Sequence, residues 1–179
     1  MKRLLFFLLL LFAALPAAAR GEEKVATRFG GAAAFGHAYD PENIDFLLVS
    51  GVALFDYDRV WPHRAPPPLR FKVEATLGLT TAPRSRAMAS GNMIALYYLD
   101  SLRTEALRPY AEAGIGLIYT DYRVAGQGLR INFNPQAGIG TEIGGDWYAA
   151  FRIHHLSNAN LHRDNRGSNS LLLQIGRYF

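Results

Sequence analysis

Residues 69–80 read LRFKVEATLGLT, and this stretch decides the fold. The odd positions are apolar throughout, whereas the even positions begin with Arg70, Lys72 and Glu74. Successive side chains of a β-strand point to opposite faces, so a period of two indicates a strand rather than a helix. The stretch therefore predicts a strand with one apolar face and one charged face.

The same alternation recurs along the chain. Residues 110–120 and 131–143 keep apolar side chains at odd positions, apart from Thr141, and the opposite face of the second run carries Asn132, Asn134 and Glu142. Further strands are predicted near residues 25–36, 43–56, 87–99, 146–158 and 169–179. The sequence thus predicts eight strands.

The first 19 residues have the pattern of a secretory signal peptide. Lys2 and Arg3 precede an apolar run from Leu4 to Leu15, and small residues follow up to Ala19. The alternative, an uncleaved membrane anchor, needs roughly 20 apolar residues. We therefore expect a signal peptide over residues 1–19 and an exported domain over residues 20–179.

Composition excludes several classes of protein. The 179 residues are 50% hydrophobic and 19% charged, which argues against disorder, and the absence of cysteine excludes a disulfide scaffold or a Cys-ligated metal. The 19 basic residues, two of them in the predicted signal peptide, stand against 15 acidic ones. Without a concentrated basic face, no nucleic-acid partner is expected. No cofactor or metal is expected either.

The distribution of polar residues separates two architectures that share this period. A soluble sandwich or lipocalin-like barrel exposes its polar face, whereas a small membrane barrel encloses it. The charged residues on the polar face have both signs and alternate with many glycines, a composition that suits a narrow interior filled by ion pairs: Arg28, Arg70, Lys72, Glu74, Glu112, Glu142 and Arg152. We therefore predict an all-β fold, an eight-stranded antiparallel transmembrane β-barrel.

The end of the chain favours the membrane barrel. Leu171, Leu173 and Ile175 share a face with the terminal Phe179, and outer-membrane barrels commonly end in such an aromatic-terminated strand. Export and a closed barrel together indicate a Gram-negative outer membrane. With both termini periplasmic, the longer connections, residues 57–68 and 100–107, are expected on the periplasmic side.

The predicted seventh strand carries the candidate chemistry. His155 and Ser157 continue its apolar face, so they are neighbours that point outward near the outer leaflet, although a His-x-Ser pair also arises by chance. If Asn169 of the last strand lies opposite Ser157, three polar side chains cluster on one outer surface. A serine nucleophile needs a base and a third group that orients the base, and these side chains supply both.

At these residues the sequence resembles the PagL-type lipid A deacylases, outer-membrane esterases that remove an ester-linked acyl chain from lipid A. The resemblance rests on residues 155–159, which read HLSNA, and on Asn165, Gly167 and Asn169. It implies that Ser157 and His155 are catalytic and that Asn158 and Asn165 position the substrate or its oxyanion. The family acid falls on Asn169, which is a departure, because the prototype has Glu there.

Two functions follow as hypotheses. The first is a serine esterase that hydrolyses the 3-O-linked acyl chain of lipid A in lipopolysaccharide, on the lipid-facing barrel surface, with Arg163 and Arg166 as candidate contacts for lipid A phosphates. The second is a non-catalytic barrel with a role in adhesion or membrane integrity. The partners expected are lipopolysaccharide and outer-membrane lipid, and a homodimer is left open.

Overall fold

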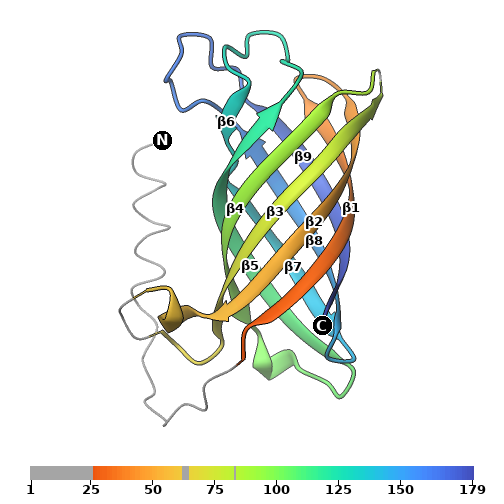
Figure 1. Cartoon of the computed structure of the whole chain (residues 1–179), viewed down its shortest axis with the longest axis vertical. Coiled ribbons are helices and arrows are strands. Elements are labelled where there is room, and N and C mark those ends of the chain that lie inside the picture. Colours follow the sequence, from red (N-terminus) through yellow and green to blue (C-terminus); the bar gives the residue numbers. More distant parts are fainter. Residues whose placement is uncertain (1–25, 62–64, 83) are drawn as a thin grey trace.

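The computed structural model describes residues 26–61, 65–82 and 84–179. The predicted signal peptide lies outside this part of the chain. Nine strand segments follow one another: β1 (Arg28–Asp40), β2 (Ile44–Asp56), β3 (Leu69–Ala82), β4 (Ala87–Tyr98), β5 (Leu107–Thr120), β6 (Ile131–Phe133), β7 (Gln136–Ile143), β8 (Trp147–Leu156) and β9 (Ser168–Tyr178). Two short 3-10 helices, η1 (Tyr57–Arg59) and η2 (Asp100–Leu102), lie in connections at one end of the barrel (Figure 1). No helix in the described residues is long and apolar enough to cross a membrane.

The strands form a closed antiparallel barrel (Figure 1). From β1 to β5 each strand pairs with the next one in the chain, β5 pairs with both β6 and β7, β7 pairs with β8, and β9 pairs with β8 and β1. β6 and β7 lie end to end along β5, so the wall has eight strand positions, as the sequence predicts. The break falls at Pro135, which has no N–H to donate to the ladder, and the register against β5 is the same on both sides of it.

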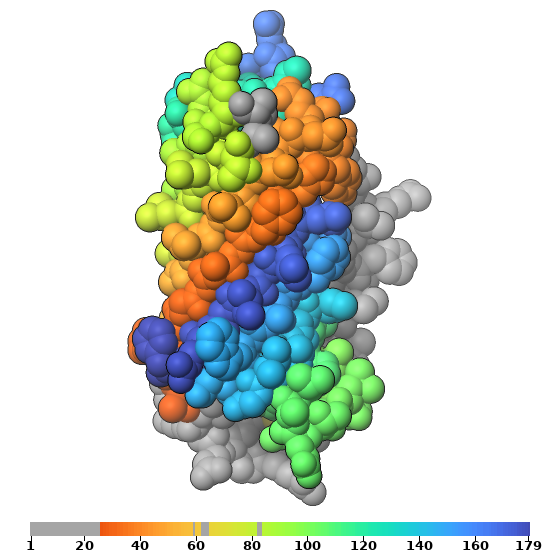
Figure 2. Space-filling model, turned by 90° about the vertical axis from the view of Figure 1, so that its right-hand side faces the viewer, coloured from red at the N-terminus to blue at the C-terminus, as the bar shows by residue number. Residues whose placement is uncertain are grey.

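Charged side chains point into the barrel and apolar side chains point outward, as predicted. Lys72, Glu74 and Arg152 are almost completely buried inside the barrel, whereas Leu77 and Leu79 are more than half exposed on the outside. Figure 2 shows β1, β9 and β8 lying side by side and slanting across one outer face. An apolar outer surface around a polar interior is the arrangement of a membrane-spanning barrel.

Ion pairs fill the centre of the barrel. Arg152 donates hydrogen bonds to both Glu74 oxygens, at 2.9 and 3.2 Å, and to Glu112 at 2.5 Å, while Lys72 donates to Glu112 at 2.6 Å. Buried charges need partners of this kind because desolvation of an unpaired charge is very costly. The predicted pairing of charges in the interior is therefore confirmed.

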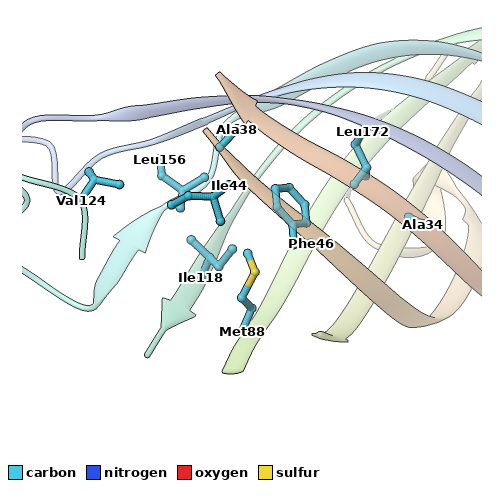
Figure 3. Packing of buried hydrophobic residues seen from close by; sticks show 9 residues of the cluster. All are labelled: Ala34, Ala38, Ile44, Phe46, Met88, Ile118, Val124, Leu156 and Leu172. Carbon is cyan, nitrogen blue, oxygen red and sulfur yellow. The ribbon is translucent and has the colours of Figure 1, made fainter. Parts of the chain in front are cut away.

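Apolar clusters close the interior above and below these ion pairs. The cluster at the end of β8 consists of Ala34, Ala38, Ile44, Phe46, Met88, Ile118, Val124, Leu156 and Leu172 (Figure 3). Leu156 stands between His155 and Ser157 in the chain and points inward into this cluster, which anchors the strand end on which those two residues lie. At the opposite end, the core contains Tyr98, Tyr110, Tyr148 and Tyr178.

The longer connections lie at both ends of the barrel. Those after β2 and β4 lie together at the end where β1 begins and β9 ends, as the strand count predicts (Figure 1). Residues 121–130 and 157–167, at the opposite end, are about as long. The longer connections are therefore not confined to one end of the barrel.

A bidentate ion pair braces the connection after β4. The guanidinium of Arg108 donates to both carboxylate oxygens of Asp100, at 2.7 and 3.1 Å. These hydrogen bonds to the charged form lower the pKa of the Asp100 carboxyl below its usual value.

Candidate active site

His155 and Asn169 face each other across β8 and β9 on the outside of the barrel. They are direct partners in the strand register, and His155 Nδ1 lies 2.7 Å from Asn169 Oδ1. The predicted register, with Asn169 opposite Ser157 and position 171 opposite His155, is wrong by two residues. The correction strengthens the candidate site, because the residue that aligns with the family acid lies directly beside the imidazole.

Ser157 follows the last residue of β8 and pairs with β6 instead of β9. Its backbone N–H donates to the Phe133 carbonyl at 3.1 Å, and the Phe133 N–H donates to the Ser157 carbonyl at 2.8 Å. The pairing of β8 with β9 ends at Leu156 and Ser168, so Ser157 has no partner in β9 and pairs with Phe133 instead. The described residues show no hydrogen bond between Ser157 Oγ and His155. Catalytic hydrogen bonds are often long without substrate, so this does not disqualify the pair.

Gly167 makes room for the imidazole. A Cβ atom at this position would lie 2.6 Å from His155 Cε1 and 3.0 Å from His155 Nε2. The Nε2 edge of the ring therefore lies over the backbone of Gly167, while the Nδ1 edge contacts Asn169. The same Cβ would lie 2.8 Å from the Leu156 carbonyl oxygen, so any larger residue at position 167 must displace the imidazole ring, the strand end or both.

Asn158 and Asn165 shape the connection after β8. The Asn158 N–H donates to Asn165 Oδ1 at 2.8 Å, and the buried Asn158 side chain donates to the Asp164 carbonyl at 2.8 Å. Asn165 Nδ2 donates to Asn160 Oδ1 at 2.9 Å. The backbone N–H of Asn158, one of the two residues expected to position the substrate or its oxyanion, thus already donates to Asn165. An amide nitrogen carries two hydrogens, and Asn165 Nδ2 uses one of them for Asn160.

Asp40 is a member of this cluster that the sequence did not indicate. Asn169 Nδ2 donates to Asp40 Oδ2 at 3.0 Å, so His155, Asn169 and Asp40 form a continuous chain of hydrogen bonds across three strands. Asp40 ends β1, and it reaches the site only because β1 closes the barrel against β9. No motif in the sequence joins two residues that are 129 positions apart.

The basic residues predicted to meet lipid A phosphates lie in the same connection. The Arg163 side chain is 90% exposed, whereas Arg166 Nη2 lies 3.9 Å from Asp40 Oδ1. The connection also contacts residues 121–130, since the Gly128 N–H donates to the Asp164 carbonyl at 2.8 Å.

His154, unlike His155, points inward and is buried, as expected for a structural residue. Residues 26–61, 65–82 and 84–179 contain no cluster of His and acidic side chains that would bind a metal ion.

Comparison with known families gives this site its context. Residues 51–177 match the family model of the lipid A 3-O-deacylases (PagL). The chain belongs to this family. The match includes His155, Ser157 and Asn169, whereas Asp40 lies before its first residue. No curated protein matches the chain in sequence.

Solved structures support the PagL-type fold. The chain is similar to the crystal structure of the outer-membrane enzyme PagL, with a TM-score of 0.62 and 22% identity over 82% of this chain and 97% of that one. It is also similar to Neisserial surface protein A, with a TM-score of 0.59 and 16% identity over 88% of this chain and 100% of that one. At these identities the similarity shows the fold alone. Family and fold together identify an outer-membrane β-barrel.

Proposed function

We propose that this protein is a lipid A 3-O-deacylase that uses Ser157 as nucleophile and His155 as general base. The observation that carries the proposal is the pairing of His155 with Asn169 on the outer surface of the barrel, two positions before Ser157, which pairs with Phe133 of β6. Polar side chains on a surface that faces lipid are costly, which favours a functional role. The acyl chains of lipid A lie in the same layer as this surface.

The reaction is an acyl transfer in two halves. Ser157 Oγ attacks the ester carbonyl carbon while His155 Nε2 accepts the hydroxyl proton, and the bond to the sugar oxygen then breaks as His155 returns the proton to that oxygen. A water molecule, deprotonated by His155, attacks the acyl-serine and releases the fatty acid. The products are lipid A with a free hydroxyl, the carboxylic acid and the original serine.

Surrounding groups serve the same chemistry. The second hydrogen of Asn165 Nδ2 is the candidate donor to the oxyanion, and Asn158 holds Asn165 in place. Arg163, which is exposed in the same connection as Asn158 and Asn165, is the candidate contact for a lipid A phosphate. Arg166 is a weaker candidate for that contact, because its guanidinium lies near Asp40.

Mass spectrometry of lipid A tests the proposal. A Gram-negative host that has no lipid A deacylase of its own would express the full chain, Ser157→Ala, His155→Ala, and a control, Ser101→Ala, whose side chain is exposed in η2 at the opposite end. We expect the wild type and the control to remove one ester-linked acyl chain and the two site variants to remove none. All four should keep the heat-modifiable gel shift of a folded barrel.

Two results would contradict the proposal. Activity that survives in folded Ser157→Ala or His155→Ala would remove these residues from the mechanism. Unchanged lipid A in cells with folded wild-type protein would favour the non-catalytic barrel with a role in adhesion or membrane integrity.

A further inference from the structure

The acid that the family pattern places at position 169 is missing here, but a carboxylate stands directly behind the amide that replaces it. Asn169 Oδ1 faces His155 at 2.7 Å, and Asn169 Nδ2 faces Asp40 Oδ2 at 3.0 Å. Asp40 comes from β1, which pairs with β9 on the side opposite β8. The imidazole, the amide and the carboxylate therefore lie in a row across the outer surface.

A register shift in β1 brings Asp40 to this position. The pairing of β1 with β9 is regular from Gly30 to Ala38, which lies opposite Ser170. A regular continuation would place Tyr39 opposite Asn169, but the register shifts and Asp40 takes that place instead. An extra residue in one strand redirects the side chains that follow it. Here it directs a carboxylate, rather than a phenol ring, at the amide.

The order of donors and acceptors then follows from chemistry. A carboxylate oxygen accepts hydrogen bonds, so Asp40 holds the Nδ2 end of the amide toward itself and turns Oδ1 toward His155. Because Oδ1 only accepts, the proton of the neutral imidazole must sit on Nδ1. The free Nε2 lone pair then points away from Asn169, on the edge of the ring over Gly167, as a general base requires.

We propose that Asp40 is a positioning residue that acts through Asn169: it fixes the amide orientation, and thereby the tautomer of His155, and supplies the negative charge that the amide lacks. This inference rests on the proposed function of Ser157 and His155. Arg166 does not compete for the same atom, because its Nη2 lies 3.9 Å from the other carboxylate oxygen, Oδ1. In this chain, a hydrogen-bonded relay of Asp40, Asn169 and His155 thus replaces a direct pair of an acid and the imidazole.

Kinetics of the purified full chain in detergent micelles with lipid A test the relay. We expect Asp40→Ala to lower kcat by roughly tenfold or more with little change in KM, because the loss affects the base and not substrate binding. Asp40→Asn, which still accepts from Asn169 but carries no charge, should give an intermediate rate. The control Asp45→Ala removes another outward carboxylate, one that lies 2.6 Å from His37, and should leave kcat unchanged.

A spectroscopic measurement separates positioning from general damage. With 15N-labelled histidine, the His155 signals, assigned by their loss in His155→Ala, should show the Nδ1–H tautomer in the wild type and in Ser157→Ala. Asp40→Ala should show a mixture of the two tautomers. This measurement needs no substrate and no activity.

The outcomes distinguish the two proposals. If Ser157→Ala is inactive but Asp40→Ala keeps its kcat, or loses kcat without a change of tautomer, the relay is refuted and the proposed function stands. If Ser157→Ala remains active, the proposed function fails. In that event the tautomer measurement still decides whether Asp40 controls His155.

Discussion

Restoring the family acid at position 169 tests the electrostatics of the site most directly. In Asn169→Glu, a charge-assisted hydrogen bond to the imidazolium would stabilise the transition state by about 1–3 kcal/mol, or roughly tenfold to a hundredfold in rate. The new carboxylate, however, would lie close to Asp40, whose Oδ2 is now 3.0 Å from Asn169 Nδ2. Because Glu is one methylene longer than Asn, we take a separation of about 4 Å, at which two unit charges repel by about 1 kcal/mol in water and by about 4 kcal/mol at an effective dielectric of 20.

The repulsion therefore offsets the gain. The Asp40 side chain is 52% exposed, so the value falls between these limits, and we expect Asn169→Glu alone to give no increase in kcat over wild type. The double variant Asn169→Glu, Asp40→Asn removes the repulsion and should exceed the single variant by roughly tenfold. Asp45→Asn in the Asn169→Glu background is the matched control and should change nothing.

Fatty acid released from lipid A, measured as kcat in detergent micelles, reports the effect. A tenfold gain in Asn169→Glu with Asp40 intact would refute the close approach of the two carboxylates. If Asn169→Glu with Asp40→Asn is no faster than Asn169→Glu alone, the repulsion between the two carboxylates is refuted as well. This comparison requires that Ser157→Ala is inactive in both backgrounds.

Three further outcomes follow from the structure. Gly167→Ala should displace the His155 ring and lower kcat by at least tenfold, whereas Gly91→Ala, whose Cβ meets nothing within 4 Å, should not; deacylation assays with the gel shift as a folding check compare them. Arg152→Ala removes the cationic partner of buried Glu74 and one of the two cationic partners of Glu112, and should lower the free energy of unfolding in lipid vesicles by about 3–5 kcal/mol; an unchanged value would contradict the assignment of the interior. Because its arginine partner lowers the pKa of Asp100, the pair stabilises the fold above about pH 4 and loses this effect as the pH falls below 3.8 through the folded-state pKa. Urea unfolding of Asp100→Asn should therefore differ from wild type by about 0.5 kcal/mol or less at neutral pH and converge with it in acid.

The sequence by itself determined the architecture and part of the site. The period of two is a local property, since each side chain points to the face opposite its neighbour. The charges of both signs on the polar faces of several strands, together with the aromatic-terminated last strand, told the interior from the lipid face. His155 and Ser157 could be placed together for the same reason, because only one residue separates them. The resemblance to the family rested on the same short stretch.

Only the tertiary structure decided which strands meet and in what register. β8 and β9 pair in one register from Trp147 and Arg177 to Leu156 and Ser168, and this register places Asn169 opposite His155 rather than opposite Ser157. Asp40 joins the site because the first and last strands close the barrel and because one extra residue shifts the register of β1. Contacts between distant segments arise from closure and from bulges, and alternation along a single strand carries no information about either.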